Sequence, residues 1–90
     1  MRQIVFRSRF KKELKKCVAR GLDMQRYQEV VTLLACDQEL PTRCRPHKLV
    51  GGYTGLWECH IAPDWLLIYY PDEENRLILY NTGTHADLFD

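Results

Sequence analysis

The fold of this chain is decided by the stretch Trp57-Glu58-Cys59-His60-Ile61-Ala62-Pro63-Asp64-Trp65. This stretch joins two apolar runs, residues 53–61 and 65–70, through a tight connection at 62–64. A third apolar run follows at 76–80, after an acidic turn that contains Pro71. Connections this short join antiparallel strands. The sequence therefore predicts a β-hairpin that extends into a three-stranded meander.

Two helices are expected upstream of the meander, after a short strand at residues 3–6. The first has an apolar stripe at helical spacing, formed by Phe10, Leu14, Cys17 and Val18. Ser8 is expected to cap its start and Gly21 to end it. Asp23 is expected to cap the second helix, which fades by Asp37. The inward-facing residues of this helix are Met24, Tyr27, Val30, Val31 and Leu34.

The order of these elements, β-α-α-β-β-β, predicts an α+β domain that spans residues 1–90. The two N-terminal helices pack on one face of a small, mainly antiparallel sheet, and the other face stays partly open. Ninety residues are enough for one domain. A hydrophobic fraction of 46% and a charged fraction of 28% are typical of a soluble globular protein.

The composition indicates a cytoplasmic protein without a membrane partner. No apolar run approaches the ~20 residues of a transmembrane helix. The apolar run at the N-terminus is too short for a signal peptide. The four cysteines form no C-x-x-C pair, so reduced thiols are expected.

Charge is divided unevenly along the chain. Residues 1–50 carry 12 Lys and Arg against 5 Asp and Glu, whereas residues 51–90 carry 1 against 7. The two parts thus have charges of +7 and −6, which combine to the net charge of +1. A basic half suggests a surface that binds a polyanion. The alternative is that these cations only keep the two helices solvated.

All three histidines fall in or beside the meander, which suggests proton-transfer chemistry. Strand alternation places Glu58 and His60 on one face and Cys59 on the other, so no thiolate–imidazole pair is expected. Asp64 lies close enough along the chain to orient an imidazole. Two alternatives remain: each histidine can be a hydrogen-bonded structural residue, or histidines and cysteines can bind zinc. The spacing does not match a standard zinc pattern, so no metal is expected.

Two segments are similar to a known protein family: HKLVGGYTGLWECHIAPDWLLIY at residues 47–69 and GTHADLF at residues 83–89. They resemble the YafQ branch of the RelE/ParE toxin superfamily, and the similarity covers nearly the whole chain. The resemblance implies a RelE-like fold and the toxin of a type II toxin–antitoxin system. It also implies a ribosome-dependent mRNA endoribonuclease that acts in the ribosomal A site and is neutralised by a cognate antitoxin. Contact with DNA is expected only through the antitoxin complex.

The resemblance also implies a set of functional positions. They are His47, His60, Asp64, His85 and Phe89, with Glu58 at a usually acidic position, although Asp is common there in relatives. RNA cleavage without a metal needs a base for the 2′-hydroxyl, an acid for the leaving 5′-oxygen, and donors for the phosphate charge. We expect His60 to be the base, backed by Asp64 and Glu58, and His85 to be the acid, although these two roles can be exchanged.

The remaining positions are expected to bind RNA. His47, together with Arg43 or Arg45, would stabilise the phosphate. Phe89 would stack on a nucleotide or, alternatively, tether the tail to the sheet. Phosphate neutralisation dominates binding to RNA, so the basic residues are expected to meet ribosomal RNA. They are Arg9, Lys11, Lys12, Lys15, Lys16, Arg43, Arg45 and Lys48.

Two other functions remain open for the sequence. One is a ParE-like toxin that binds a protein target such as gyrase and does not cut RNA. Three titratable imidazoles argue against it, because inhibition by docking does not require them. The other is a decayed toxin that is kept for antitoxin binding or repression. No cofactor is expected for the endoribonuclease.

Overall fold

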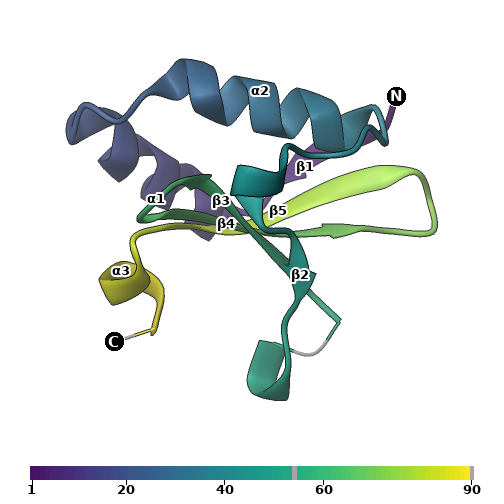
Figure 1. Ribbon diagram of the computed structural model, residues 1–90. Helices are drawn as coiled ribbons and strands as arrows, with labels where there is room; N and C mark the ends of the chain where they lie inside the picture. The colour runs from purple at the N-terminus through teal and green to yellow at the C-terminus, as the bar shows by residue number, and fades with distance from the viewer. Residues whose placement is uncertain (54, 90) are drawn as a thin grey trace.

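The computed structural model describes residues 1–53 and 55–89, and over them it shows two long helices lying across one face of a five-stranded sheet (Figure 1). The strands are β1 (Gln3–Phe6), β2 (His47–Lys48), β3 (Trp57–Ala62), β4 (Trp65–Pro71) and β5 (Arg76–Gly83). The helices are α1 (Ser8–Ala19), α2 (Met24–Ala35) and α3 (His85–Phe89), with short 3-10 helices at η1 (Thr42–Cys44) and η2 (Gly51–Tyr53).

The strand order is β1-β5-β4-β3-β2. Strand β1 runs parallel to β5, and all other neighbours are antiparallel. The predicted meander is confirmed as β3-β4-β5. Two rows of facing residues cross it, Cys59–Leu67–Thr82 and His60–Leu66–Gly83. The α+β prediction is therefore confirmed, with both N-terminal helices on one side of a mainly antiparallel sheet.

Three local predictions differ from the structure. The strand expected at 53–61 begins only at Trp57, because the preceding segment turns through η2, where Gly51 has a φ of +73°. Thr54, within the expected strand, lies outside the described residues. Strand β5 continues to Gly83, beyond its predicted end, and both β2 and α3 were missed. Elements of two and five residues are too short to give a periodic sequence signal.

Helix ends follow the predictions at two of three positions. Ser8 is the first helical residue instead of the cap, so that prediction is wrong; Arg7 occupies the cap and makes no side-chain bond there. Asp23 does cap α2, because its carboxylate accepts from the backbone N–H of Gln25 at 3.0 Å. Gly21 adopts a φ of +78° just past α1, a conformation that favours glycine.

The core lies between the helices and the sheet. An aromatic row crosses it, since the ring centroids of Phe10 and Tyr27 are 6.4 Å apart and those of Tyr27 and Trp65 are 6.3 Å apart. Leu66 and Ile68 point to the other face and are nevertheless fully buried, so that face is covered over β4. No helix within residues 1–53 and 55–89 is long and apolar enough to cross a membrane.

The end of β5 is held by polar contacts with α1 and β4. Strand β1 pairs with β5 only as far as Leu79, and beyond it the Glu13 carboxylate accepts from Thr82 N at 3.3 Å and from the Asn81 amide. Inside the core, Thr82 Oγ1 accepts from Trp65 Nε1 and donates to the Leu66 carbonyl, both at 2.8 Å. These bonds fix the strand that leads into α3.

Replacing Thr82 with Val should lower the free energy of unfolding by about 1–3 kcal/mol, because it leaves the buried Trp65 indole N–H without an acceptor. Urea denaturation followed by tryptophan fluorescence measures this. Thr32→Val is the matched control on the exposed side of α2, with an expected change within about 0.5 kcal/mol. Equal stability of the two variants would contradict the role assigned to this bond.

Candidate active site

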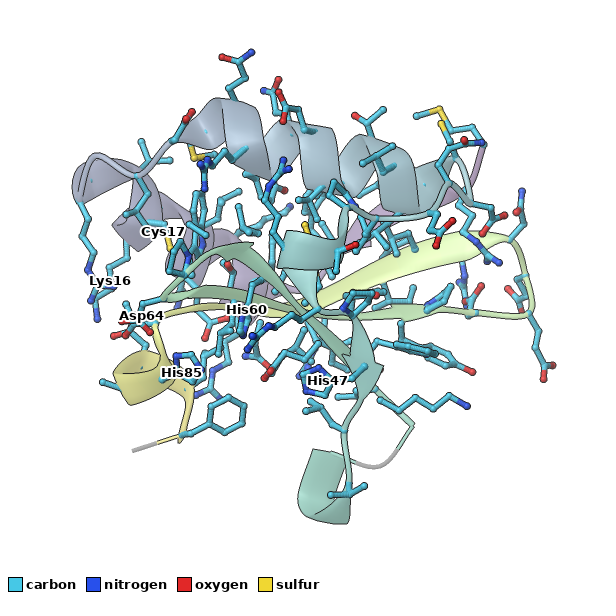
Figure 2. All side chains as sticks on the ribbon, viewed as in Figure 1. Lys16, Cys17, His47, His60, Asp64 and His85 are labelled. Carbon is cyan, nitrogen blue, oxygen red and sulfur yellow. The ribbon has the colours of Figure 1, made fainter. Side chains whose placement is uncertain are left out.

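The three histidines lie on the side of the sheet away from α1 and α2 (Figure 2). His60 projects from β3, His85 begins α3, and His47 lies in β2 directly opposite Glu58. Strand alternation explains the arrangement: Cys59 belongs to the core beneath the helices, so its neighbours Glu58 and His60 face the other way. The prediction that Glu58 and His60 share a face is confirmed.

Asp64 and His85 form the closest polar pair of the site. Asp64 Oδ1 accepts from His85 Nδ1 at 2.6 Å and from the His85 backbone N–H at 3.1 Å. The side-chain bond is the main reason why the pKa of Asp64 lies below its usual range, and the backbone bond adds to it. Because Nδ1 donates to the carboxylate, Nε2 is the ring nitrogen that His85 has for proton exchange.

His47 is held between two acceptors. Its Nε2 lies 3.3 Å from Glu58 Oε1, and its Nδ1 lies 2.9 Å from the carbonyl oxygen of Arg45. Arg45 has a φ of +46°, a left-handed conformation that follows η1. Each ring nitrogen of His47 thus faces an oxygen acceptor. Glu58 is only 6% exposed, so this pair holds a buried carboxylate next to a surface imidazole.

His60 lies between these pairs and contacts His85 through its ring. The two ring centroids are 5.8 Å apart with an interplanar angle of 76°. Over residues 1–53 and 55–89, no carboxylate oxygen lies within hydrogen-bonding distance of the His60 ring.

The predicted pairing of both carboxylates with His60 is therefore wrong. The Asp64 carboxylate points to the start of α3, where it accepts hydrogen bonds from the ring and the backbone N–H of His85. Glu58 faces His47 across β2, a strand that the sequence did not predict.

Cys59 does not contribute a nucleophile to this site. Cys59 is fully buried, and burial raises the pKa of its thiol well above the usual value. The exclusion of a Cys59–His60 pair is thus confirmed. Within the part of the chain that the structure describes, no group of three or more His, Cys, Asp or Glu side chains is arranged to hold a metal ion. The expectation of catalysis without a metal stays a prediction.

Of the basic residues predicted to bind RNA, Arg45 and Lys48 lie beside His47, and five others lie on α1. Lys48 Nζ lies 5.6 Å from the centre of the Trp57 ring, and Lys16 Nζ lies 3.8 Å from an Asp87 oxygen. Exposed positions are occupied by Arg9, Lys11, Lys12, Lys15, Lys16, Arg43, Arg45 and Lys48. Phe89 ends α3 and is 45% exposed. The RNA contacts of all these residues stay predictions.

Sequence reasoning missed the contacts that hold α3 itself. Asp87 receives two hydrogen bonds from Arg20, at 2.6 and 3.0 Å, although the two residues are 67 positions apart. This contact lowers the pKa of Asp87 well below its usual range. The one local signal was the spacing of Thr84 and Asp87, a polar pair three residues apart that is typical of a helix start.

Comparison with known proteins identifies the family. A family model described as "Bacterial toxin of type II toxin-antitoxin system, YafQ" matches residues 2–90. This chain belongs to the YafQ toxin family. It is 35% identical over 89 residues to the mRNA interferase toxin YafQ of Escherichia coli K12, which covers 98% of this chain and 96% of that protein.

Solved structures of bacterial toxins share the fold. A metal-bound toxin from Helicobacter pylori has a TM-score of 0.93 and 38% identity, covering 99% of this chain and all of that one. YafQ from E. coli BL21(DE3) has a TM-score of 0.92 and 33% identity, with both chains fully covered. YafQ in an E. coli DinJ–YafQ complex has a TM-score of 0.90 and 34% identity, again over both full chains. The RelE-like fold prediction is confirmed.

The Asp64–His85 contact predicts how Asp64 titrates. Folding lowers the pKa of Asp64, so its carboxylate keeps the contact with His85 at any pH above the ordinary carboxyl pKa. The contact is lost as the pH falls through the folded-state pKa of Asp64. In His85→Ala, the pKa of Asp64 should rise toward the ordinary value, but only in part, because the backbone N–H remains. Carboxyl ¹³C NMR titration measures this. An unchanged Asp64 pKa would show that the imidazole does not hold the carboxylate.

Proposed function

We propose that this YafQ-family toxin is an endoribonuclease that cuts mRNA in the ribosomal A site by acid–base catalysis without a metal. One arrangement supports the proposal most. Asp64 fixes the His85 imidazole, and the ring of His60 packs edge-on against the ring of His85. Two imidazoles in contact, only one of them paired with a carboxylate, can start in different protonation states. An acid and a base at neutral pH require this difference.

The geometry favours His85 as the acid and His60 as the base. The Asp64 carboxylate orients His85 through Nδ1, which leaves Nε2 to protonate the leaving 5′-oxygen. His60, which has no carboxylate partner among residues 1–53 and 55–89, takes the 2′-hydroxyl proton. The 2′-oxygen then attacks phosphorus as the bond to the 5′-oxygen breaks, leaving a 2′,3′-cyclic phosphate and a 5′-hydroxyl.

His47 fits the third role, stabilisation of charge on the phosphate. Its ring lies between two acceptors on the same side of the sheet as His60 and His85, where an imidazolium would add positive charge. Charge that is fixed before the reaction stabilises the extra negative charge of the transition state. Arg45 contributes its backbone carbonyl to this contact, and its exposed guanidinium remains a proposed phosphate ligand.

We also propose that a cognate antitoxin neutralises this chain in the cytoplasm, where ribosomes are. YafQ of E. coli forms a complex with DinJ, and its similarity to this chain extends over the full length of both. The ParE-like alternative predicts intact mRNA after induction, and the decayed-toxin alternative predicts growth without arrest.

The catalytic proposal predicts that His60→Gln and His85→Gln each slow cleavage of ribosome-bound mRNA by roughly 100-fold or more, since acid–base groups contribute about that much. Mapping of transcript 5′ ends after induction measures this, with codon-phased cuts expected for the wild type. Glu29→Gln on α2 is the control and should cut normally. Full cleavage by folded His85→Gln would overturn the catalytic assignment.

The basic face of α1 predicts salt-sensitive ribosome binding. Replacing Lys11, Lys12 and Lys15 together with Gln should weaken binding and flatten the plot of log affinity against log salt. Each cation that meets a phosphate contributes a slope of roughly 0.7–0.9. The same triple replacement with Arg keeps the charge and should preserve both affinity and slope. An unchanged slope in the Gln variant would place the ribosome contact elsewhere.

A further inference from the structure

Helix α3 carries His85 but is too short to hold that residue in place by itself. It has five residues, and none of them is buried. A helix of this length is not stable by itself, because too few hydrogen bonds follow the costly first turn. The position of the His85 ring therefore depends on polar contacts between α3 and the rest of the molecule.

Asp87 makes most of these contacts. Arg20, just after α1, donates to both of its carboxylate oxygens, at 2.6 and 3.0 Å. Within the turn, Thr84 N–H donates to Asp87 Oδ2 at 3.0 Å, and Asp87 N–H donates to Thr84 Oγ1 at 3.1 Å. This reciprocal pair satisfies N–H groups at the start of α3, as a capping box does.

Gly83 leaves room for the Asp87 side chain, because it has no Cβ. A Cβ at this position would lie 2.9 Å from both Cβ and Oδ2 of Asp87, a spacing that real Cβ atoms do not show. Strand β5 therefore passes directly against the Asp87 side chain. The Asp87 side chain is 22% exposed and that of Arg20 is 36% exposed, so the pair is partly shielded from solvent.

His85 is consequently held from two directions. Asp64, in the β3–β4 turn, binds its ring and backbone N–H, and Arg20 holds the same helix through Asp87 two residues later. A bidentate Arg–carboxylate pair restrains orientation as well as distance. Without this pair, α3 would lose its bidentate contact with the end of α1 and would fray more readily.

We propose that Arg20 and Asp87 are positioning residues that clamp α3 to the end of α1 and thereby keep the His85 imidazole in place to deliver its proton. The proposal deepens the nuclease function and rests on it. Nothing in the clamp touches substrate: Arg20 acts through Asp87, and Asp87 acts through the turn that begins α3. The clamp keeps the His85 imidazole next to His60 through polar contacts and not through burial of apolar side chains.

The test compares Asp87→Ala, Arg20→Ala and the double variant in single-turnover cleavage of ribosome-bound mRNA. Each should lower the cleavage rate by roughly 10- to 100-fold, the usual cost of a misplaced catalytic group, with ribosome affinity kept. The double variant should cleave no more slowly than Asp87→Ala, because either single substitution already removes the Arg20–Asp87 contact. Arg20→Lys, which keeps charge but not bidentate geometry, should recover part of the rate. Arg26→Ala is the matched control and should cleave as the wild type does.

Two results would overturn the proposal. If Arg20 instead contacts RNA, Arg20→Ala weakens ribosome binding while Asp87→Ala does not slow cleavage. If the pair is only a stabilising surface contact, Asp87→Ala lowers Tm and leaves the cleavage rate of the folded protein unchanged.

A second measurement does not depend on nuclease activity. In NMR spectra of the purified protein, Asp87→Ala should shift the His85 ring Hε1 resonance and speed hydrogen exchange of the α3 amides. His47 should keep its wild-type shift, because its contacts are to Glu58 and Arg45. Unchanged His85 signals would refute the clamp. Shifted signals in a protein whose wild type cuts no RNA would retain the clamp and reject the nuclease function.

Discussion

The structure depends on the burial of β4 on both of its faces. Trp65, Leu66, Leu67 and Ile68 are each at most 1% exposed, although alternate residues point to opposite sides of the sheet. A one-residue slip of β4 against its neighbours would exchange the two sets and, against β5, break the bond between Trp65 and Thr82. This constraint fixes the register of β3, and through it the face that presents Glu58 and His60.

The site combines this rigid hairpin with short elements that are held by polar contacts. Strand β2 has two residues and α3 has five, yet they supply His47 and His85. Each short element is tied to the meander by an imidazole–carboxylate pair, one with Glu58 and one with Asp64. The carboxylates thus hold the imidazoles in place. His60 needs no such tether, because it stands on a strand of the sheet.

In the folded chain, ion pairs engage carboxylates of the acidic half but leave most of the cations of α1 exposed. Carboxylates of the acidic half are engaged in pairs: Asp87 with Arg20, Asp64 with His85, and Asp72 with Arg76. The first of these crosses between the two halves of the sequence. Most cations of α1 remain exposed, so the acidic half does not cancel the basic helix by covering it. Positive surface remains for a polyanion, which agrees with the proposed action on the ribosome.

The sequence by itself determined the meander, the two long helices, the Asp23 cap and the opposite faces of Cys59 and His60. All of these follow from periodicity or chain neighbours, because strand alternation and helix turns act over a few residues. Only the tertiary structure decided which carboxylate meets which imidazole, and which cation holds α3. Asp64 and His85 are 21 positions apart, and Arg20 and Asp87 are 67 apart. Contacts at such separations depend on where the packed sheet brings chain segments together, which no local pattern encodes.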